Sequence, residues 1–454
     1  MKKSVCIVGG GISGLTAAYR LQKEGIPVAV FEAGNEPGGA IHTHKHNGWL
    51  VEAGPNTVRY NSLLVESLIK ELGIENDLIF AGPQAKNRYI VKQGAPQALP
   101  SSLTGFLKTP LFGKRAKWGL LAEPFAAKYR YHEDESIADF VTRRLGRDFL
   151  DYAVDPFVSG IYAGDPNQLS VEHTFGPLYE FDRKYGSIFL GALRSAIGGK
   201  NTGRPKKRGI FSFSQGMNTL PYALAKTLGS SFRPNTRVKS IAKLRDRWYI
   251  TTESGDEHEC GVVIYSAPLH QLSSIDIKTD VRWPLAELTS MEYAPIAMLS
   301  LGFNRAHVKH PLDGFGMLVP GVENSPLLGV LFPSSIFENR APDGHVLMSC
   351  FIGGAKRPEL LDLDQNEIQK LVMAELYKYL GVNGEPAFVH FRSWKRGIPQ
   401  YNKGFGAFLI DLKFVEDNNP GFLFASNFRG GVAVPNCLEN AWEAAGKTLE
   451  FLNG

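Results

Sequence analysis

No uninterrupted apolar run in this sequence approaches the roughly 20 residues that a membrane-spanning helix needs. Cysteine is scarce: the 454 residues include four, scattered without the spacing of a disulfide framework or a zinc site, at Cys6, Cys260, Cys350 and Cys437. The formal net charge of +5 is small for this length and does not indicate nucleic-acid binding. We therefore expect a cytoplasmic protein with free thiols and no nucleic-acid partner, whose contact with any membrane is peripheral.

Glycine is abundant, and several glycines stand in the N-terminal stretch VCIVGGGISG, residues 5–14. An apolar run leads into a G-x-G-x-x-G pattern made by Gly9, Gly11 and Gly14, and a helical pattern and a second strand ending in Glu32 follow. In such a βαβ unit the glycines permit the tight turn, the approach of a pyrophosphate and the packing of helix on strand. Glu32 is placed to accept hydrogen bonds from a ribose. The stretch predicts a dinucleotide site.

Further glycine turns favour FAD over a nicotinamide dinucleotide. Gly38 and Gly39 follow shortly after the first unit, and the turn 54–57 follows them. A longer cofactor lying along the domain needs close backbone approach at several points. At the C-terminus, residues 421–452 predict a strand, a glycine turn and a helix with Pro435 at its start. The start of that helix would stabilise negative charge on a reduced flavin; the plainer alternative, a terminal helix packed on the sheet, is compatible with that role.

Several motifs resemble those of the flavoprotein amine-oxidase-like superfamily and, within it, of the protoporphyrinogen oxidases. They are GPNTVR at 54–59, SGIYAGDPNQLS at 159–170, QGMNTLPYAL at 215–224, IPQY at 398–401 and GVAVPNCLE at 431–439. GIYAGD is the most diagnostic, because general amine oxidases do not carry it. The resemblance implies oxidation of protoporphyrinogen IX to protoporphyrin IX in haem biosynthesis. A non-covalent FAD would receive the hydride, and oxygen would be the acceptor.

The resemblance also implies which residues hold the cofactor. They are Gly9, Gly10, Gly11, Ile12, Ser13, Gly14, Glu32, Ala33, Gly39, Ala40, Gly54, Pro55, Asn56, Thr57, Val238, Val432, Ala433 and Val434. Many members of the superfamily have arginine or another large residue where this chain has Ala40. We therefore expect backbone contacts at that turn rather than a side-chain contact with phosphate.

A porphyrinogen is a large apolar macrocycle with propionate groups, so its site needs apolar walls and a cation. The resemblance points to Arg88 as the propionate partner, which suits the bidentate guanidinium; a surface arginine at a strand edge is the alternative. Phe315, Met317, Leu318 and Phe351 are the expected walls, with plain core positions as the alternative. No catalytic side chain is expected, because the flavin takes the hydride and the protein positions the substrate.

The alternating histidines of HTHKH, residues 42–46, would share one face of a strand. A metal site is one interpretation, but no cysteine or carboxylate stands at ligand spacing nearby. An exposed or cofactor-flanking strand is the interpretation we favour.

The fold expected is α/β with α+β parts, divided among three domains. A discontinuous Rossmann-like FAD-binding domain comprises 1–85, 205–275 and 390–454, and a substrate domain comprises 86–99 and 276–389. Residues 100–204 form a helical domain whose segment 99–125 mixes aromatic residues with lysines and arginine. This mixture suits an interfacial surface on anionic lipid at the inner face of the cell membrane. The alternative is a loop and helix packed on the core; the basic stretch 203–209 is expected as a solvated loop that adds lipid attraction.

Other functions remain open at this point. Coproporphyrinogen III, with four propionates rather than two, is the rival substrate, and a second cationic anchor would favour it. A general amine oxidase would need an aromatic cage beside the flavin, where the sequence offers only Phe428. A non-enzymatic porphyrin carrier is a further alternative. A homodimer and hand-off of the product to a ferrochelatase are also left open by the sequence.

Overall fold

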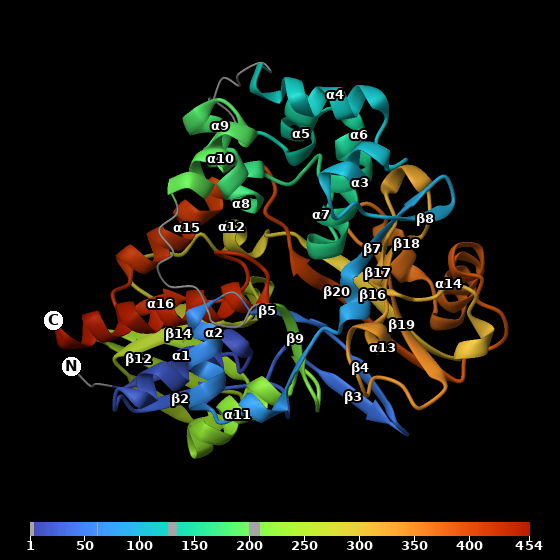
Figure 1. Ribbon diagram of the computed structural model, residues 1–454. Helices are drawn as coiled ribbons and strands as arrows, with labels where there is room; N and C mark the ends of the chain where they lie inside the picture. Colours follow the sequence, from blue (N-terminus) through green and yellow to red (C-terminus); the bar gives the residue numbers. More distant parts are fainter. Residues whose placement is uncertain (1–3, 61, 126–133, 199–208) are drawn as a thin grey trace.

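The computed structural model describes residues 4–60, 62–125, 134–198 and 209–454. It has a mixed α/β fold in which two large sheets lie at opposite ends and a group of helices lies above them (Figure 1). The first sheet is parallel, with strand order β10-β2-β1-β14-β21. Its strands are β1 (Val5–Val8), β2 (Val28–Phe31), β10 (Phe232–Arg233), β14 (Val262–Tyr265) and β21 (Phe422–Phe424).

Helices and a smaller sheet enclose this parallel sheet. The helices α1 (Ile12–Lys23), α11 (Thr219–Leu228) and α16 (Val434–Asn453) share one apolar core with it. A second core lies against a four-stranded sheet of β13 (Glu257–Cys260), β12 (Arg247–Thr252), β11 (Val238–Leu244) and β15 (Asp276–Lys278). Burial on both faces explains why strands such as VCIV carry apolar residues at every position.

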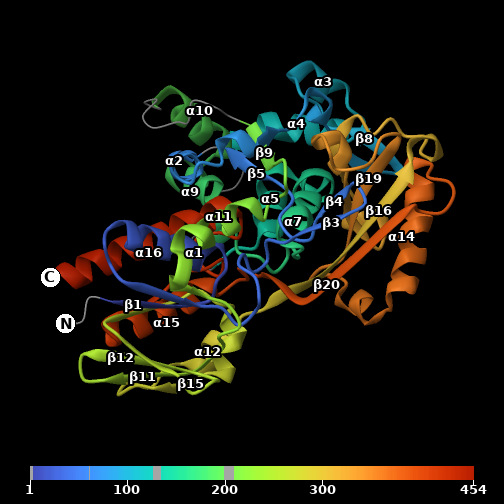
Figure 2. The same ribbon diagram turned by 90° about the horizontal axis from the view of Figure 1, so that it is seen from below.

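The second large sheet is mixed and has seven strands, in the order β20-β16-β19-β18-β17-β7-β8. They are β7 (Asn87–Lys92), β8 (Ala95–Ala98), β16 (Tyr293–Asn304), β17 (Gly314–Leu318), β18 (Leu327–Leu331), β19 (His345–Gly353) and β20 (Phe388–Pro399). The helix α14 (Gln365–Leu380) covers one face (Figure 2). The hairpin β3 (Thr43–His46) and β4 (Trp49–Glu52) covers part of the other, where the Trp49 ring fills the space left by Gly302.

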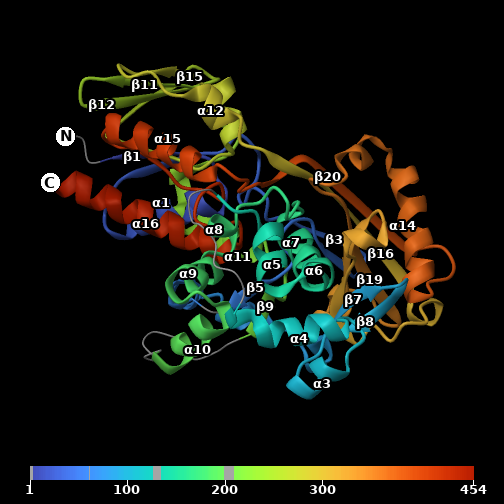
Figure 3. The same cartoon turned by 90° about the horizontal axis from the view of Figure 1, so that it is seen from above.

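A group of helices spans most of residues 103–198 (Figure 3). It comprises α3 (Leu103–Lys108), α4 (Lys114–Ala122), α5 (Ile137–Leu145), α6 (Arg147–Phe149), α7 (Asp155–Tyr162), α8 (Val171–Thr174), α9 (Gly176–Tyr185) and α10 (Ile188–Gly198). Ser136 caps α5 by accepting a hydrogen bond from the Asp139 N–H, as its place before an apolar run predicts. Buried ion pairs of Asp182 with Arg143 and Arg144 connect α9 to α5.

A third sheet of three strands joins distant parts of the chain. Its order is β5-β9-β6, made of β5 (Val58–Tyr60), β6 (Leu78–Phe80) and β9 (Gly209–Phe213). Buried Glu52, at the end of β4, accepts hydrogen bonds from the Thr43 hydroxyl and the Met217 N–H, and lies 3.6 Å from Arg340. The network ties the hairpin on the seven-stranded sheet to the loop before α11.

Candidate functional site

The first glycine turn, between β1 and α1, leaves space for a ligand at one position only. A Cβ atom added to Gly14 would lie 2.0 Å from the Gly9 carbonyl oxygen, and one added to Gly9 would lie 2.9 Å from the Ala267 nitrogen. A Cβ added to Gly11 would meet nothing within 4 Å. Two of these glycines are therefore required by packing, whereas Gly11 exposes bare backbone at the start of α1, where N–H groups attract phosphate.

Glu32 lies over this turn at the carboxyl end of β2. One carboxylate oxygen accepts a hydrogen bond from the Gly10 N–H at 2.7 Å, and the other accepts one from the Gly34 N–H, also at 2.7 Å. Ala33, half-buried, follows Glu32 and precedes Gly34 in the sequence. Val238 is buried at the start of β11. This part of the chain lies close to Glu32, because the Thr236 N–H donates to the Glu32 carbonyl at 2.7 Å. The structure brings the ribose and adenine candidates together.

The second and third glycine turns lie against the first. The Gly38 N–H donates to the Gly10 carbonyl at 2.9 Å, and a Cβ on Gly39 would lie 3.2 Å from the Gly11 Cα. Gly54 approaches Ala40 so closely that a Cβ would lie 2.0 Å from the Ala40 carbonyl oxygen. The half-buried residues Pro55, Asn56 and Thr57 continue from there. Three loops that are apart in the sequence thus form one backbone-lined cradle, defined by residues 9–14, 38–40 and 54–57.

The N-termini of α1 and α16 lie at the same end of the parallel sheet. The Ser13 hydroxyl donates to the Cys437 carbonyl at 3.4 Å, and further along the pair Arg20 stacks on Trp442 at 4.8 Å. Neither helix start has a side-chain cap, and neither has an acidic residue in its first turn. Both positive dipole ends are therefore available to an anionic group. Val432, Ala433 and Val434 lead into α16, with Ala433 at its N-cap.

Tyr401, which the sequence motif IPQY contains without revealing its role, fixes the turn before α16. Its hydroxyl donates to the Asn427 carbonyl at 2.7 Å and accepts a hydrogen bond from the Gly431 N–H at 3.0 Å. Burial raises the pKa of Tyr401 far above its usual range, so the hydroxyl stays protonated. The signal that could have identified it is a lone tyrosine directly after the last strand of the seven-stranded sheet.

The expected substrate walls divide between the two faces of that sheet. Phe351 on β19 is paired with Met298 on β16 and with Gly329 on β18. Gly329 is also paired with Leu318 on β17. Leu318 is paired with Ile90 on β7. Directly paired residues share a face. We call these five residues, Met298, Phe351, Gly329, Leu318 and Ile90, the apolar row.

The apolar row adjoins the cradle. Ala53, which directly precedes Gly54, belongs to the same apolar cluster as Met298 and Phe351. The Leu318 edge of the row is covered by α7, where a Cβ on Gly160 of the GIYAGD motif would lie 3.0 Å from Leu318. The apolar row and the backbone-lined cradle are therefore neighbours.

Arg88 and Phe315 lie together at the β7 edge. Arg88 is exposed, and its guanidinium lies 5.3 Å from the centre of the half-buried Phe315 ring. Arg88 precedes Ile90 by two residues on β7 and so shares the face of the apolar row. Met317 lies on the opposite face, buried in the core beneath α14, so the structure does not bring it to the other expected walls.

The glycine turns and the parallel sheet match a known protein family. A family model described as flavin containing amine oxidoreductase matches residues 12–449. The chain belongs to the flavin-containing amine oxidoreductase family. It is 34% identical to the mitochondrial protoporphyrinogen oxidase of Nicotiana tabacum, over 99% of this chain and 95% of that protein. It is 26% identical to coproporphyrinogen III oxidase of Bacillus subtilis, over 99% of each chain.

A solved structure supports the family fold. The crystal structure of a protein from an Exiguobacterium species, assigned as a protoporphyrinogen oxidase, matches with a TM-score of 0.83 at 23% identity, over 99% of both chains. As a member of the flavin-containing family, the chain is an FAD-dependent oxidoreductase. The cradle fits that cofactor, because Gly11 offers open space where any side chain would intrude. Bound FAD supplies a hydride acceptor.

The histidines of HTHKH flank this flavoprotein site on a strand. His44 and His46 on β3 have ring centres 6.4 Å apart, and His42 precedes them, 3.5 Å from Glu36. Within the described ranges, no three His, Cys, Asp or Glu side chains gather as a metal ion would require. The cysteines are free and buried.

Of the aromatic residues expected at a membrane surface in the helical segment, some are buried and others are exposed. Phe112 is buried against Phe149 with ring centres 4.6 Å apart, as the core alternative predicts, whereas Trp118 is 71% exposed and Leu107 61% exposed. None of the helices in the described part of the chain is long and apolar enough to cross a bilayer. Except for Gly209, the basic stretch 203–209 lies outside the described residues.

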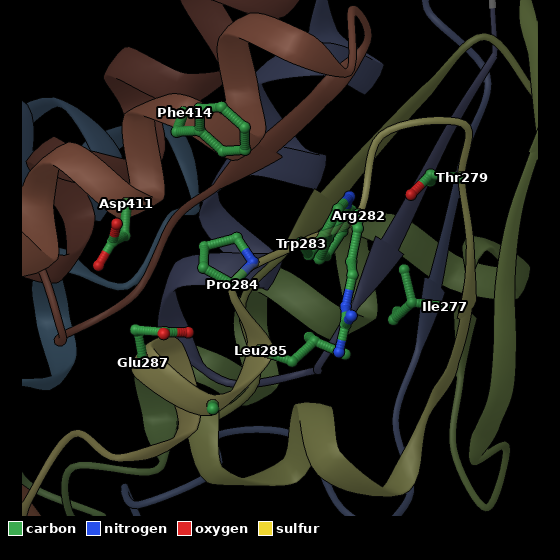
Figure 4. A pocket seen from close by; sticks show the side chains of 10 residues that line it. Ile277, Thr279, Arg282, Trp283, Pro284, Leu285, Glu287, Asp411 and Phe414 are labelled. Atoms are coloured by element: carbon green, nitrogen blue, oxygen red, sulfur yellow. The ribbon is translucent and has the colours of Figure 1, made fainter.

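A cavity of about 720 Å³ lies away from the cradle, between α12 (Leu285–Thr289) and α15 (Phe405–Asn418) (Figure 4). Arg282, Glu287 and Asp411 bring charges of both signs to its lining, and Pro284 and Phe414 are among its apolar walls. None of the predicted cofactor or substrate residues lines it. This cavity is therefore separate from the cradle and the adjoining sheet face.

Proposed function

We propose that this flavoenzyme oxidises a porphyrinogen to the corresponding porphyrin in haem biosynthesis. Protoporphyrinogen IX is the leading substrate, and coproporphyrinogen III is the second candidate. The observation that carries the proposal is the apolar row beside a flavin cradle, in a chain that full-length relatives named for these two substrates resemble. General amine oxidation is less well supported, because curated relatives that cover nearly the whole chain carry porphyrinogen names.

In this proposal the protein acts by positioning. Phe351 and Leu318 give the macrocycle an apolar face to lie on, and Arg88 binds a propionate with its guanidinium. The cradle holds FAD non-covalently, and the helix starts of α1 and α16 stabilise negative charge on its phosphates and reduced ring. Conversion of a porphyrinogen to its porphyrin removes three hydrides and three protons. Bound FAD would accept the hydrides, and the residues of this chain would hold the substrate close to it, without a named general base, so that the protons leave to solvent. Oxygen is the proposed acceptor.

The predicted domains divide this work. Residues 1–85, 205–275 and 390–454 hold FAD, residues 86–99 and 276–389 hold substrate, and residues 100–204 meet the membrane. A homodimer and transfer of the product to a ferrochelatase remain predictions. The inner face of the cell membrane is the proposed location.

Anaerobic mixing of the purified FAD-loaded enzyme with protoporphyrinogen IX and, separately, coproporphyrinogen III tests the proposal. We expect rapid bleaching of the flavin absorbance by at least one of them, followed by porphyrin fluorescence when oxygen is admitted. An Arg88→Met variant should raise KM about tenfold or more, as loss of a charge-assisted bidentate contact predicts. A flavin that neither porphyrinogen bleaches would refute the oxidase.

Membrane attachment rests on an exposed apolar patch of the helical segment, defined by Trp118, Phe125, Phe189 and Leu193. Their exposed fractions are 71%, 90%, 59% and 49%. Glu123 joins the elements that carry them, because its carboxylate accepts hydrogen bonds from the Ile188 and Phe189 N–H groups. Such a concentration of exposed large apolar side chains marks an interaction surface.

Co-sedimentation with vesicles tests this attachment. Wild-type enzyme should pellet with vesicles rich in anionic phosphatidylglycerol, and a Trp118→Ser, Phe125→Ser double variant should stay in the supernatant with unchanged flavin content. Leu244→Ser, an exposed apolar residue on β11, is the matched control. Equal sedimentation of the double variant and the wild type would remove the patch from the proposal.

A further inference from the structure

The seven-stranded sheet carries a second arginine on the face of the apolar row. Arg392 on β20 is directly paired with Met298 on β16, the first member of that row. The row therefore extends from Arg392 across six strands to Ile90, and Arg88 lies two residues from Ile90 on the same strand. One face thus has a cation toward each edge and apolar side chains between them.

Arg392 lacks a carboxylate partner. It is half-buried, and in the described part of the chain its guanidinium makes no hydrogen bond and no ion pair; its ring contact is with Trp394, at 5.1 Å. Burial lowers the pKa of Arg392. A partly desolvated guanidinium is stabilised when a carboxylate satisfies its fork of donors.

His390, two residues earlier on the same strand, has a ring nitrogen without a hydrogen-bond partner among the described residues. Its Nε2 atom is buried without a hydrogen bond, and its ring stacks on His44 with centres 4.4 Å apart. Burial, and then the positive charges of His44, Arg392 and His42, lower the pKa of His390 to about 4. Among these side chains, His42 has a carboxylate within ion-pair distance, that of Glu36 at 3.5 Å. The neighbourhood of Arg392 therefore repels cations and offers unused donors to an anion.

We propose that Arg392, with His390 beside it, binds a second carboxylate of the substrate, at the opposite edge of the sheet face from Arg88. The inference rests on the proposed porphyrinogen oxidation. Five inter-strand steps separate β7 from β20, which is about 24 Å. A macrocycle with its acid arms and two long arginine side chains would together have to bridge that span.

The two candidate substrates differ in what they present to such a pair of anchors. Protoporphyrinogen IX carries its two carboxylates on neighbouring pyrroles and so presents them toward one edge. Coproporphyrinogen III carries one carboxylate on every pyrrole and can engage both edges at once. Arg392 is therefore a specificity residue that adds affinity for coproporphyrinogen III, the second candidate substrate, without adding affinity for protoporphyrinogen IX, the leading one.

Fluorescence titration of the FAD-loaded enzyme with coproporphyrin III and with protoporphyrin IX tests the anchor. Replacement of Arg392 by Met keeps an unbranched side chain but removes the charge and the guanidinium contact with Trp394. Arg392→Met should raise the Kd of coproporphyrin III about tenfold or more, with the Kd of protoporphyrin IX unchanged within about twofold. Arg392→Lys should restore part of the coproporphyrin affinity. Lys395→Met, an exposed cation on the same strand, is the control and should change neither Kd.

Equal losses for the two porphyrins, or no loss for either, would overturn the anchor. Anaerobic bleaching of the wild-type flavin, measured in parallel, tests the oxidase separately. If neither porphyrinogen bleaches the flavin while coproporphyrin III still binds through Arg392, the oxidase fails and the anchor stands. If bleaching occurs but Arg392→Met changes the Kd values of the two porphyrins equally, or changes neither, the anchor fails and the oxidase stands.

Discussion

The cradle and the sheet face beside it are built in opposite ways. The cradle presents backbone: its turns approach so closely that a Cβ on Gly14 or Gly54 would overlap a carbonyl oxygen. The sheet face presents side chains, with Phe351 and Leu318 between the cations Arg88 and Arg392. A backbone site can bind a cofactor shared by a whole family, whereas a side-chain surface can change its ligand by single substitutions.

The two regions should also differ in how well they tolerate substitution. A backbone turn tolerates no added volume where its own atoms already touch, so its sequence is fixed by packing. An arginine at the edge of a strand is held by one ring contact and can be exchanged without disturbing the ladder. We expect substitutions in the cradle to affect folding and FAD retention, and substitutions on the sheet face to affect substrate choice.

The sharpest test of the comparison is a pair of alanine substitutions within one glycine turn. Gly14→Ala forces a Cβ to within 2.0 Å of the Gly9 carbonyl oxygen and should destabilise the protein by about 3 kcal/mol or more. Gly11→Ala meets no protein atom within 4 Å and has a φ of −71°, so it should fold normally and lose FAD. Thermal unfolding and flavin content measure the two effects. A stable, yellow Gly14→Ala protein would contradict the packing argument.

The cradle was predictable from sequence because its determinants are local. Gly9, Gly11 and Gly14 stand at a fixed spacing after an apolar run, and Glu32 ends the next strand. Each residue acts through its own backbone geometry or through a neighbour along the chain. The parallel pairing of β1 with β2 follows from the same pattern, since the helix between them returns the chain to the same end of the sheet.

The sheet face was only partly predictable because its determinants are registers between distant strands. Phe315, Met317 and Leu318 are close in sequence, but strand alternation and the irregular register at Gly314–Met317 send Met317 to the core. Arg392 and Phe351 share a face only because each pairs with Met298. No motif marks Arg392, and the IPQY motif that contains Tyr401 does not reveal its role, because both roles depend on cross-strand pairing and on one turn. The domain boundaries remain predictions.

Glu52 joins the two regions, so its ionisation should weaken their connection. Burial raises the pKa of Glu52 to about 7, against the opposing effect of hydrogen bonds and Arg340. Because the folded state holds this proton more tightly than the unfolded state, stability should fall as pH rises from about 4.5 to about 7, by at most about 3 kcal/mol. Urea unfolding at pH 5, 6, 7 and 8 should show a smaller fall for Glu52→Gln. Parallel pH curves for the two proteins would contradict the assignment.

Glu32 tests whether the cradle has any side-chain contribution of its own. Its carboxylate accepts hydrogen bonds from the Gly10 and Gly34 N–H groups, and Glu32→Gln replaces one acceptor by a donor. We expect the Kd of FAD to rise about tenfold, as loss of one charge-assisted hydrogen bond predicts. Fluorescence titration of the apoprotein with FAD measures it. Glu24→Gln, at the far end of α1, is the control; an equal change there would show a general charge effect.

Substitution of Tyr401 should give the smallest effect. Tyr401 lies two residues after the end of the sheet strand β20, and its hydroxyl fixes the turn before α16, so it tests where the sheet face ends and the cofactor site begins. Tyr401→Phe removes the acceptor of the Gly431 N–H and the donor to the Asn427 carbonyl, at a cost of about 1 kcal/mol. We expect FAD affinity to fall a few-fold and the visible flavin spectrum to shift, with porphyrin affinity unchanged. Tyr377→Phe, on the exposed side of α14, should alter neither. If Tyr401→Phe instead changed porphyrin affinity alone, the residue would belong to the sheet face, and the boundary between the backbone site and the side-chain site would move to include it.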